Sequence, residues 1–395
     1  MGEGIFKQYR LLFGLFIIIP FLVACSEDSS TTSANETDYT YEQPADLNDG
    51  WQTGSVADAG LNETTLTQMI DYINNTHSQC IYNILIFKNN QLVFEKYFDG
   101  FLYSDNPPGS NGAYISYRPD IAHFLASVTK SVSLTLFGIA IDKGFVEPDV
   151  TLPVIHYFPQ YSDYLDEAHA SVQILHLLTM TSGLDWNENT YPYGDSRNDV
   201  YILFNTGDPI RFVLMKSMHG TPGTIFHYNS GATNVLAEIV HQGYGEDFLQ
   251  FAEEYLFGPL EITNYRWDFS HGDYVFASGG LYLTPRDLAK IGYLFLNNGT
   301  WNNQQIVSQE WVQRSTQSHI IPTMALGSGY GYLWWIKNFY VNGQTYHSFK
   351  AMGWGGQEIF IFRKLNMVVV FTGANYVTNP LCDTIMQNYI LPALQ

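Results

Sequence analysis

Ser127-Val128-Thr129-Lys130 places a hydroxyl and an amine three residues apart. On a helix, residues at this spacing share a face, so the two side chains can meet. A serine hydroxyl is a poor nucleophile until a base takes its proton, and a buried lysine has a lowered pKa that suits it to that task. The residues that follow, up to Asp142, are apolar on almost every side and predict a buried helix that begins at Ser127. Free N–H groups at a helix start favour developing negative charge, so Ser127 and Lys130 are a candidate nucleophile and base.

A second motif, Tyr228-Asn229-Ser230, begins another predicted helix 101 residues after Ser127. A phenol near a cation can be held as phenolate and relay protons between a nucleophile and a leaving group. The chain contains 28 tyrosines, so this motif taken alone favours a packing role for Tyr228.

The third motif is Gly353-Trp354-Gly355-Gly356-Gln357, which precedes two predicted strands. Glycines at such a place let a substrate approach the backbone closely. The N–H of Gln357 is a candidate to pair with that of Ser127 as an oxyanion hole. A simple glycine turn explains the motif equally well when it is taken alone.

The elements that position these motifs are strands at both ends of the chain and helices in the middle. This order predicts an α+β fold: an antiparallel sheet built from both chain ends and flanked by helices, with a large, mostly helical inserted domain. We expect a catalytic domain over 61–395, with an α/β part at 61–100 and 330–395, a helical part at 101–329, and the active site in the cleft between them. The segment 101–120 is expected to be a loop. The predicted strands are 82–87, 92–98, 331–336, 345–350, 358–362 and 367–372, and the main helices are 127–142, 173–180, 232–241, 285–297 and 379–394.

Together the three motifs, in this order and spacing, resemble the serine beta-lactamase and penicillin-binding-protein superfamily over about residue 61 to the C-terminus. The nearest branch looks like the class C-like esterases and 6-aminohexanoate-dimer hydrolases. The resemblance implies a beta-lactamase/transpeptidase-like fold, with Ser127 as nucleophile, Lys130 as base and Tyr228 as acid/base partner. It also implies a set of substrate-binding and oxyanion residues made of Ser127, Ser230, Trp354, Gly355, Gly356 and Gln357.

Two departures from the superfamily pattern bear on the substrate. Trp354 stands where beta-lactamases carry the lysine of K-T-G, which helps to bind the carboxylate of the antibiotic. Ser230 stands where they carry the asparagine of Y-x-N, so an amide that grips the lactam substituent is missing. Both departures favour a neutral ester or amide over a penicillin.

The leading hypothesis is therefore a serine hydrolase that works through an acyl-enzyme, with an ester as first choice and a short or peptide-like amide as second. The alternatives are a beta-lactamase or D-alanyl-D-alanine peptidase, or a penicillin-recognising or cell-wall-binding lipoprotein without turnover. An alpha/beta-hydrolase is disfavoured because no G-x-S-x-G elbow occurs. No H-E-x-x-H and no phosphate-binding glycine loop occur, so neither metal nor cofactor is expected. The net charge of −20 argues against a nucleic-acid partner. Aromatic residues make up 16% of the chain, which fits a packed core or an aromatic-lined cleft.

The first residues read as a targeting segment. A positive start with Lys7 and Arg10 precedes an apolar run that ends at Ala24-Cys25. Leu22-Val23-Ala24-Cys25 resembles a bacterial lipobox, so we expect a signal peptide over 1–24, a lipid on Cys25, and a flexible tether over 25–60. The protein would then be an exported bacterial lipoprotein, held at the membrane and, in a Gram-negative cell, at the periplasmic face of the outer membrane.

Two further cysteines are Cys80 and Cys382. An oxidising export route would allow a disulfide between them, and two buried free thiols are the alternative.

Overall fold

A computed structural model describes residues 39–76, 80–105, 108–271, 274–324, 326–376 and 381–395. The predicted signal peptide and Cys25 lie outside these residues. None of the helices in the described ranges is long and apolar enough to cross a membrane.

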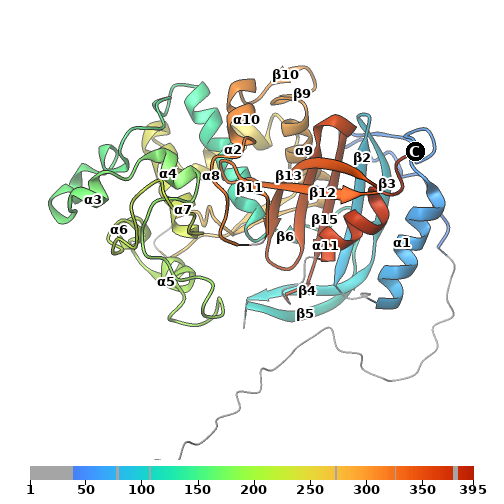
Figure 1. The fold of residues 1–395 in the computed structure, drawn as a ribbon, viewed down its shortest axis with the longest axis horizontal. Helices are drawn as coiled ribbons and strands as arrows, with labels where there is room; N and C mark the ends of the chain where they lie inside the picture. The colour runs from blue at the N-terminus through green and yellow to red at the C-terminus, as the bar shows by residue number, and fades with distance from the viewer. Residues whose placement is uncertain (1–38, 77–79, 106–107, 272–273, 325, 377–380) are drawn as a thin grey trace, which may run out of the picture.

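The centre of the structure is an eight-stranded sheet in the order β1-β3-β2-β15-β14-β13-β12-β11 (Figure 1). Neighbouring strands are antiparallel except for β1 and β3, which are parallel. Strand β2, from the N-terminal part of the chain, pairs with the last strand, β15, inside the sheet. The predicted antiparallel sheet built from both ends is therefore confirmed. Its strands are β1 (Gln52–Thr53), β2 (Ile81–Lys88), β3 (Gln91–Tyr97), β11 (Gly329–Tyr330), β12 (Trp335–Val341), β13 (Gln344–Gly353), β14 (Gln357–Phe362) and β15 (Met367–Gly373).

Both faces of the central strands are buried, because successive side chains on a strand point to opposite faces and each face has its own helices. Val368 and Val370 belong to the core on one side, and Val369 and Phe371 to the core on the other. On the first side, α9 (Pro285–Leu296) lies directly on β14 and β15, where a side chain at Gly292 would collide with Ile359 and Val368. The first side also holds α2 (Val128–Asp142), and the second is covered by α1 (Glu63–Thr76), α11 (Leu381–Ile385) and the π-helical turn η5 (Met386–Ile390) (Figure 1).

The helical part lies beside the sheet, at the opposite end of the molecule from α1, and α2 lies between the helical part and the sheet (Figure 1). Its longest helix, α7 (Ser230–Tyr244), packs against α2 and is buried over most of its length up to Val240, while its last turn is exposed. The other helices here are α3 (Glu167–Ala170), α4 (Ile174–Leu178), α5 (Asp199–Asn205), α6 (Pro209–Leu214) and α8 (Phe248–Ala252), with short turns η1 (Val154–His156), η2 (Pro159–Tyr164) and η3 (Glu253–Phe257). Although α9 and α10 (Gln309–Ser315) fall within the predicted helical part 101–329, α9 packs on the sheet.

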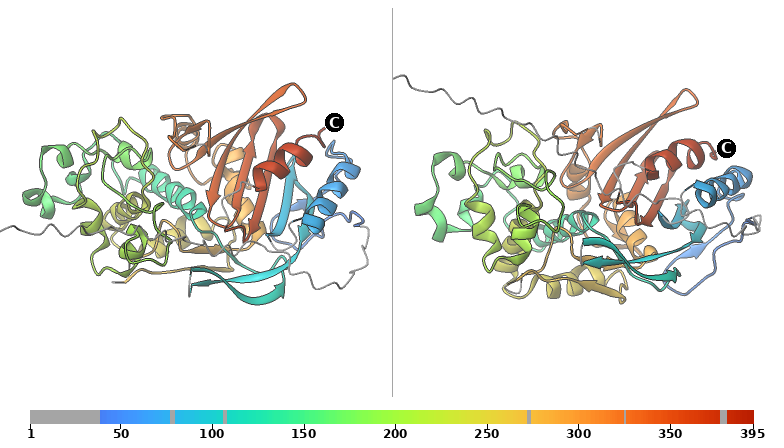
Figure 2. Two further views of the ribbon diagram at one scale, coloured as in Figure 1. Left: turned by 60° about the horizontal axis from the view of Figure 1, so that its bottom comes forward. Right: turned by 90° about the horizontal axis from the view of Figure 1, so that it is seen from below.

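Short strands that were not predicted complete the fold. Residues 101–105 and 108–116, expected as loop, belong to the two strands of an antiparallel hairpin. An aromatic contact holds this hairpin to the body of the protein: Tyr103 stacks on Phe124 at a ring-centroid distance of 4.0 Å. Figure 2 shows this hairpin running along one end of the sheet towards the helical part. The small strands are β4 (Asp99–Asp105) with β5 (Pro108–Ser116), β6 (His123–Phe124) with β8 (Leu281–Leu283) and β7 (Tyr265–Trp267), and β9 (Thr300–Trp301) with β10 (Gln304–Gln305); η4 (Arg363–Leu365) joins β14 to β15.

One expectation is corrected, and one open question is answered. Residues 39–60 are not a free tether: Trp51 is buried against Phe87 and Tyr293, and Arg286 pairs with Asp49 at 3.0 Å. Apolar burial outweighs the polar composition of this stretch. Of the alternatives left open for Cys80 and Cys382, a disulfide between the two is excluded, because Cys382 is a buried free thiol.

Candidate active site

Ser127 lies at the turn that leads into α2, directly in front of the first helical residue. The residue before it, Ala126, has a φ of 46°. This left-handed conformation costs a non-glycine residue about 1–3 kcal/mol and persists only where the surroundings impose it, as at many active sites. The strained turn leaves the Ser127 side chain on the wall of a cavity.

Lys130 is buried one helical turn further on, beneath Ser127. Its Nζ donates to Ser127 Oγ at 2.9 Å and to the Ser278 carbonyl at 2.8 Å. Burial lowers the pKa of the Lys130 amine to about 8, and the carboxylate of Glu188 acts in the opposite direction. A large part of the Lys130 population is therefore neutral slightly above physiological pH, as a general base requires.

Tyr228 completes the group of three side chains. Its hydroxyl shares a hydrogen bond with Ser127, and the Lys130 Nζ lies 5.0 Å from the centre of its ring. Burial, followed by the neighbouring Tyr330 and Glu188, raises the pKa of Tyr228 well above its usual value. The sequence suggested a phenolate held by a cation, whereas this environment keeps the phenol protonated. Tyr228 is thus placed to donate a proton, and Lys130 to accept one.

Glu188 is a buried carboxylate that the sequence analysis missed. Its Oε2 accepts from the Ser230 N–H at 2.8 Å and from the Trp186 indole at 2.6 Å, and its Oε1 accepts from the Ser230 hydroxyl at 3.0 Å. Ser230 therefore lines the cavity while its hydroxyl is engaged by Glu188. A single glutamate in a long loop gives no sequence signal, because its partner is 42 residues away along the chain.

The turn that carries Trp354 meets the nucleophile through Gly353. A Cβ at Gly353 would lie 2.3 Å from the Leu125 carbonyl oxygen and 3.2 Å from the Ser127 nitrogen, so only glycine allows this approach. Gly355 and Gly356 follow with φ values of 91° and 88°, a region that side chains disfavour. Across the described ranges of the chain, neither the Ser127 N–H nor the Trp354 N–H donates a hydrogen bond.

Gln357, whose N–H was predicted as an oxyanion donor, pairs with Gly353 in the β13–β14 ladder. It is not among the residues that line the Ser127 cavity. Its side-chain amide donates to the Gly373 carbonyl at 2.6 Å and accepts from the Gly373 N–H at 3.2 Å. Gln357 therefore ties the turn to β15, and Gly355 and Gly356 shape the turn behind Trp354.

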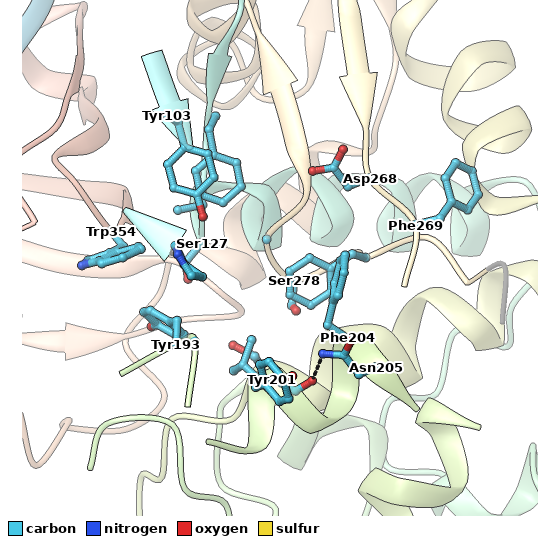
Figure 3. A pocket seen from close by; sticks show the side chains of 18 residues that line it. Tyr103, Ser127, Tyr193, Tyr201, Phe204, Asn205, Asp268, Phe269, Ser278 and Trp354 are labelled. Carbon is cyan, nitrogen blue, oxygen red and sulfur yellow. Dashed lines mark hydrogen bonds between the residues drawn. The ribbon is translucent and has the colours of Figure 1, made fainter. Parts of the chain in front are cut away.

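The cavity above Ser127 has a volume of about 690 Å³, within the range of small-molecule sites (Figure 3). The Trp354 indole forms one wall, with ring-centroid distances of 5.0 Å to Tyr193 and 4.5 Å to Tyr376. Asp268 is the one charged side chain on the described lining, and it pairs with Arg266 at 2.9 Å. Eight of the 18 described lining residues are aromatic: Tyr103, Phe124, Tyr193, Tyr201, Phe204, Phe269, Phe276 and Trp354.

Comparison with known proteins agrees with this geometry. Residues 82–379 match the model of the beta-lactamase family. A 6-aminohexanoate-dimer hydrolase from Paenarthrobacter ureafaciens is 26% identical over 323 residues, which are 77% of this chain and 75% of that protein.

Two solved structures share the fold. A beta-lactamase/D-alanine carboxypeptidase from Yersinia pestis, complexed with citrate, superposes with a TM-score of 0.66 at 16% identity, covering 87% of this chain and 100% of that one. A family VIII carboxylesterase superposes with a TM-score of 0.63 at 15% identity, covering 86% and 98%. The resemblance that the three motifs indicate is confirmed: this chain belongs to the beta-lactamase family.

Proposed function

We propose that this protein is a serine esterase that hydrolyses neutral esters through an acyl-enzyme on Ser127. The observation that carries the proposal is the contact of 2.9 Å between the Lys130 amine and the Ser127 hydroxyl, at a site where burial lowers the pKa of the amine to about 8. Such a pair supplies a nucleophile and its base without any further group.

In the first half of the reaction, the neutral Lys130 amine takes the proton of Ser127 while Ser127 Oγ attacks the ester carbonyl carbon. The negative charge that develops on the carbonyl oxygen needs two donors. We assign them to the N–H groups of Ser127 and Trp354, in place of Gln357, because these two have no hydrogen-bond acceptor among the described residues and Gly353 brings their backbones together. Tyr228 donates its proton to the departing alkoxide, and Lys130 restores it.

In the second half, a water molecule attacks the acyl carbonyl and loses its proton to the same Lys130–Tyr228 pair. The tetrahedral intermediate collapses, Ser127 regains its proton, and the carboxylic acid leaves. The same three side chains thus serve both halves of the cycle.

The walls of the cavity support an ester over a penicillin. Neither lysine nor arginine occurs among the described residues that line it. A substrate carboxylate would be desolvated there without a partner, which is costly. A neutral ester leaves no charge unpaired, and aromatic rings can pack on its apolar parts.

The test is a panel of p-nitrophenyl esters, short linear amides and a chromogenic cephalosporin, with a fluorophosphonate probe as an active-site label. We expect ester turnover and stoichiometric labelling in the wild type, and neither in Ser127→Ala. Labelling of the alanine variant would contradict the nucleophile. One product per site without further release would instead support a penicillin-recognising lipoprotein.

A further inference from the structure

Three aromatic side chains surround the mouth of the Ser127 cavity. Tyr201 and Phe204 lie on α5 at a spacing of three residues, which puts them on one face of the helix. Phe269 comes from the loop that follows β7. All three line the cavity, and they are 38%, 37% and 39% exposed. Figure 3 shows them across the cavity from Ser127 and Trp354.

Contacts outside the cavity hold this aromatic rim (Tyr201, Phe204 and Phe269) in place. The His271 N–H donates to the Phe204 carbonyl at 2.7 Å, which joins the loop of Phe269 to the end of α5. The Phe204 ring meets Phe276 edge-on at a centroid distance of 5.3 Å. The rim is therefore built by the fold, and its rings remain partly exposed around a hollow. Exposed apolar surface of this kind marks a binding site.

The chemistry of the rim fixes the kind of group that it can bind. The one charged side chain on the described lining, Asp268, is paired with Arg266. A charged substrate group would therefore meet no free counter-charge there. A cavity of about 690 Å³ is also far larger than an acetyl ester requires.

We infer that the aromatic rim binds an apolar arm of the substrate, an alkyl chain or a phenyl ring that extends from the ester group at Ser127. The inference rests on the proposed esterase function and names its substrate class: esters of medium length, with an apolar arm on either the acyl or the alcohol side. Each methylene that the rim removes from water then strengthens transition-state binding.

The experiment measures kcat/KM in two series. One lengthens the acyl chain, from p-nitrophenyl acetate to hexanoate, and the other lengthens the alcohol, from methyl to hexyl butyrate. We expect kcat/KM to rise about two- to fourfold per methylene in one series, and that series identifies which arm reaches the rim. Both Phe269→Ser and Tyr201→Ser should flatten this slope.

The matched control is Tyr340→Ser. Tyr340 is 69% exposed on β12 and does not line the cavity, so its variant should keep the wild-type slope. Thermal melting checks that each variant folds. Because the rim side chains are partly exposed, their replacement should lower the melting temperature little.

Labelling of Ser127 by p-nitrophenyl alkylphosphonates of increasing chain length supplies a readout that does not need turnover. If neither kcat/KM in the two ester series nor the labelling rate rises with chain length in the wild type, the inference is overturned, while the proposed esterase function still stands. Unchanged slopes in both rim variants would overturn it as well. A protein that neither hydrolyses any ester nor is labelled would defeat the proposed function, and with it this inference.

Discussion

Replacing Glu188 by glutamine should move the acid limb of the pH–rate profile to lower pH. In the proposed mechanism the base is Lys130, whose pKa is lowered to about 8 by burial. About one tenth of the enzyme then carries a neutral lysine at pH 7, so kcat/KM should rise about tenfold from pH 7 to a plateau above about pH 9. The carboxylate of Glu188 favours the protonated amine, and glutamine keeps its shape while removing the charge.

We expect a shift of about one pH unit. This corresponds to about 1.4 kcal/mol, the interaction energy of two unit charges about 12 Å apart at an effective dielectric constant of about 20. A shift of that size would bring the neutral fraction of Lys130 at pH 7 to about one half, and would raise kcat/KM there about fivefold if the transition state were otherwise unchanged.

The assay measures kcat/KM for a p-nitrophenyl ester between about pH 5.5 and about pH 10, a range that covers the titration of a group with a pKa of about 8. Glutamine also loses part of the hydrogen bonding to Ser230, so Ser230→Ala is the control: it removes the contact of 3.0 Å to Glu188 and keeps the charge. The acid limb of the pH–rate profile of Ser230→Ala should stay at the wild-type pH. If the acid limb of Glu188→Gln lies at an unchanged or higher pH, the assignment of Lys130 as the titrating base is refuted.

Four further predictions concern single side chains. Tyr228→Phe should slow acylation about 10²- to 10⁴-fold in stopped-flow assays, and a wild-type rate would place the proton donor elsewhere. Lys130→Met should abolish turnover but raise the free energy of unfolding at pH 7. In the wild type the pKa of Lys130 is about 8 when folded and 10.5 in the unfolded chain, and this difference costs about 3 kcal/mol of stability below pH 8. That gain should shrink as the pH rises from 8 to 10.5 in urea titrations, and a less stable variant at pH 7 would contradict it. The wild type should prefer short p-nitrophenyl esters over benzylpenicillin by at least about 10²-fold in kcat/KM (about 2.7 kcal/mol), and Trp354→Lys should narrow this gap; equal wild-type rates would favour a beta-lactamase. Cys25→Ala should release the protein from the membrane fraction of cells, and unchanged partition would exclude the proposed lipid anchor.

The parts of the site that the sequence predicted are those encoded locally. Ser127 and Lys130 lie on one helical turn, and the buried helix after them is apolar throughout, so their meeting follows from helix geometry. The central strands could also be predicted from the sequence, because strands of a sheet that is covered on both faces are continuous apolar runs, such as Ile84–Phe87.

The parts that it missed depend on contacts between distant residues. Glu188 becomes part of the site only when the fold brings it to Ser230. The paired strands 99–105 and 108–116 contain many Gly, Pro and Ser residues. They are held by the stacking of Tyr103 on Phe124, a contact that no local sequence pattern reveals. Gln357 was chosen as a donor because it follows the glycines, whereas the close approach to Ser127 occurs at Gly353, before them.

The close approach of Gly353 to Ser127 means that the backbone and the side chain of Trp354 are positioned independently. Gly353 fixes the backbone beside Ser127, so the position of the Trp354 N–H is set by main-chain packing and not by the indole. The indole itself points to the cavity and packs on Tyr193 and Tyr376. The side chain at this position can therefore be exchanged while the N–H that we propose as an oxyanion donor stays where it is. A fold with such a position is well suited to acquire new substrates by single substitutions.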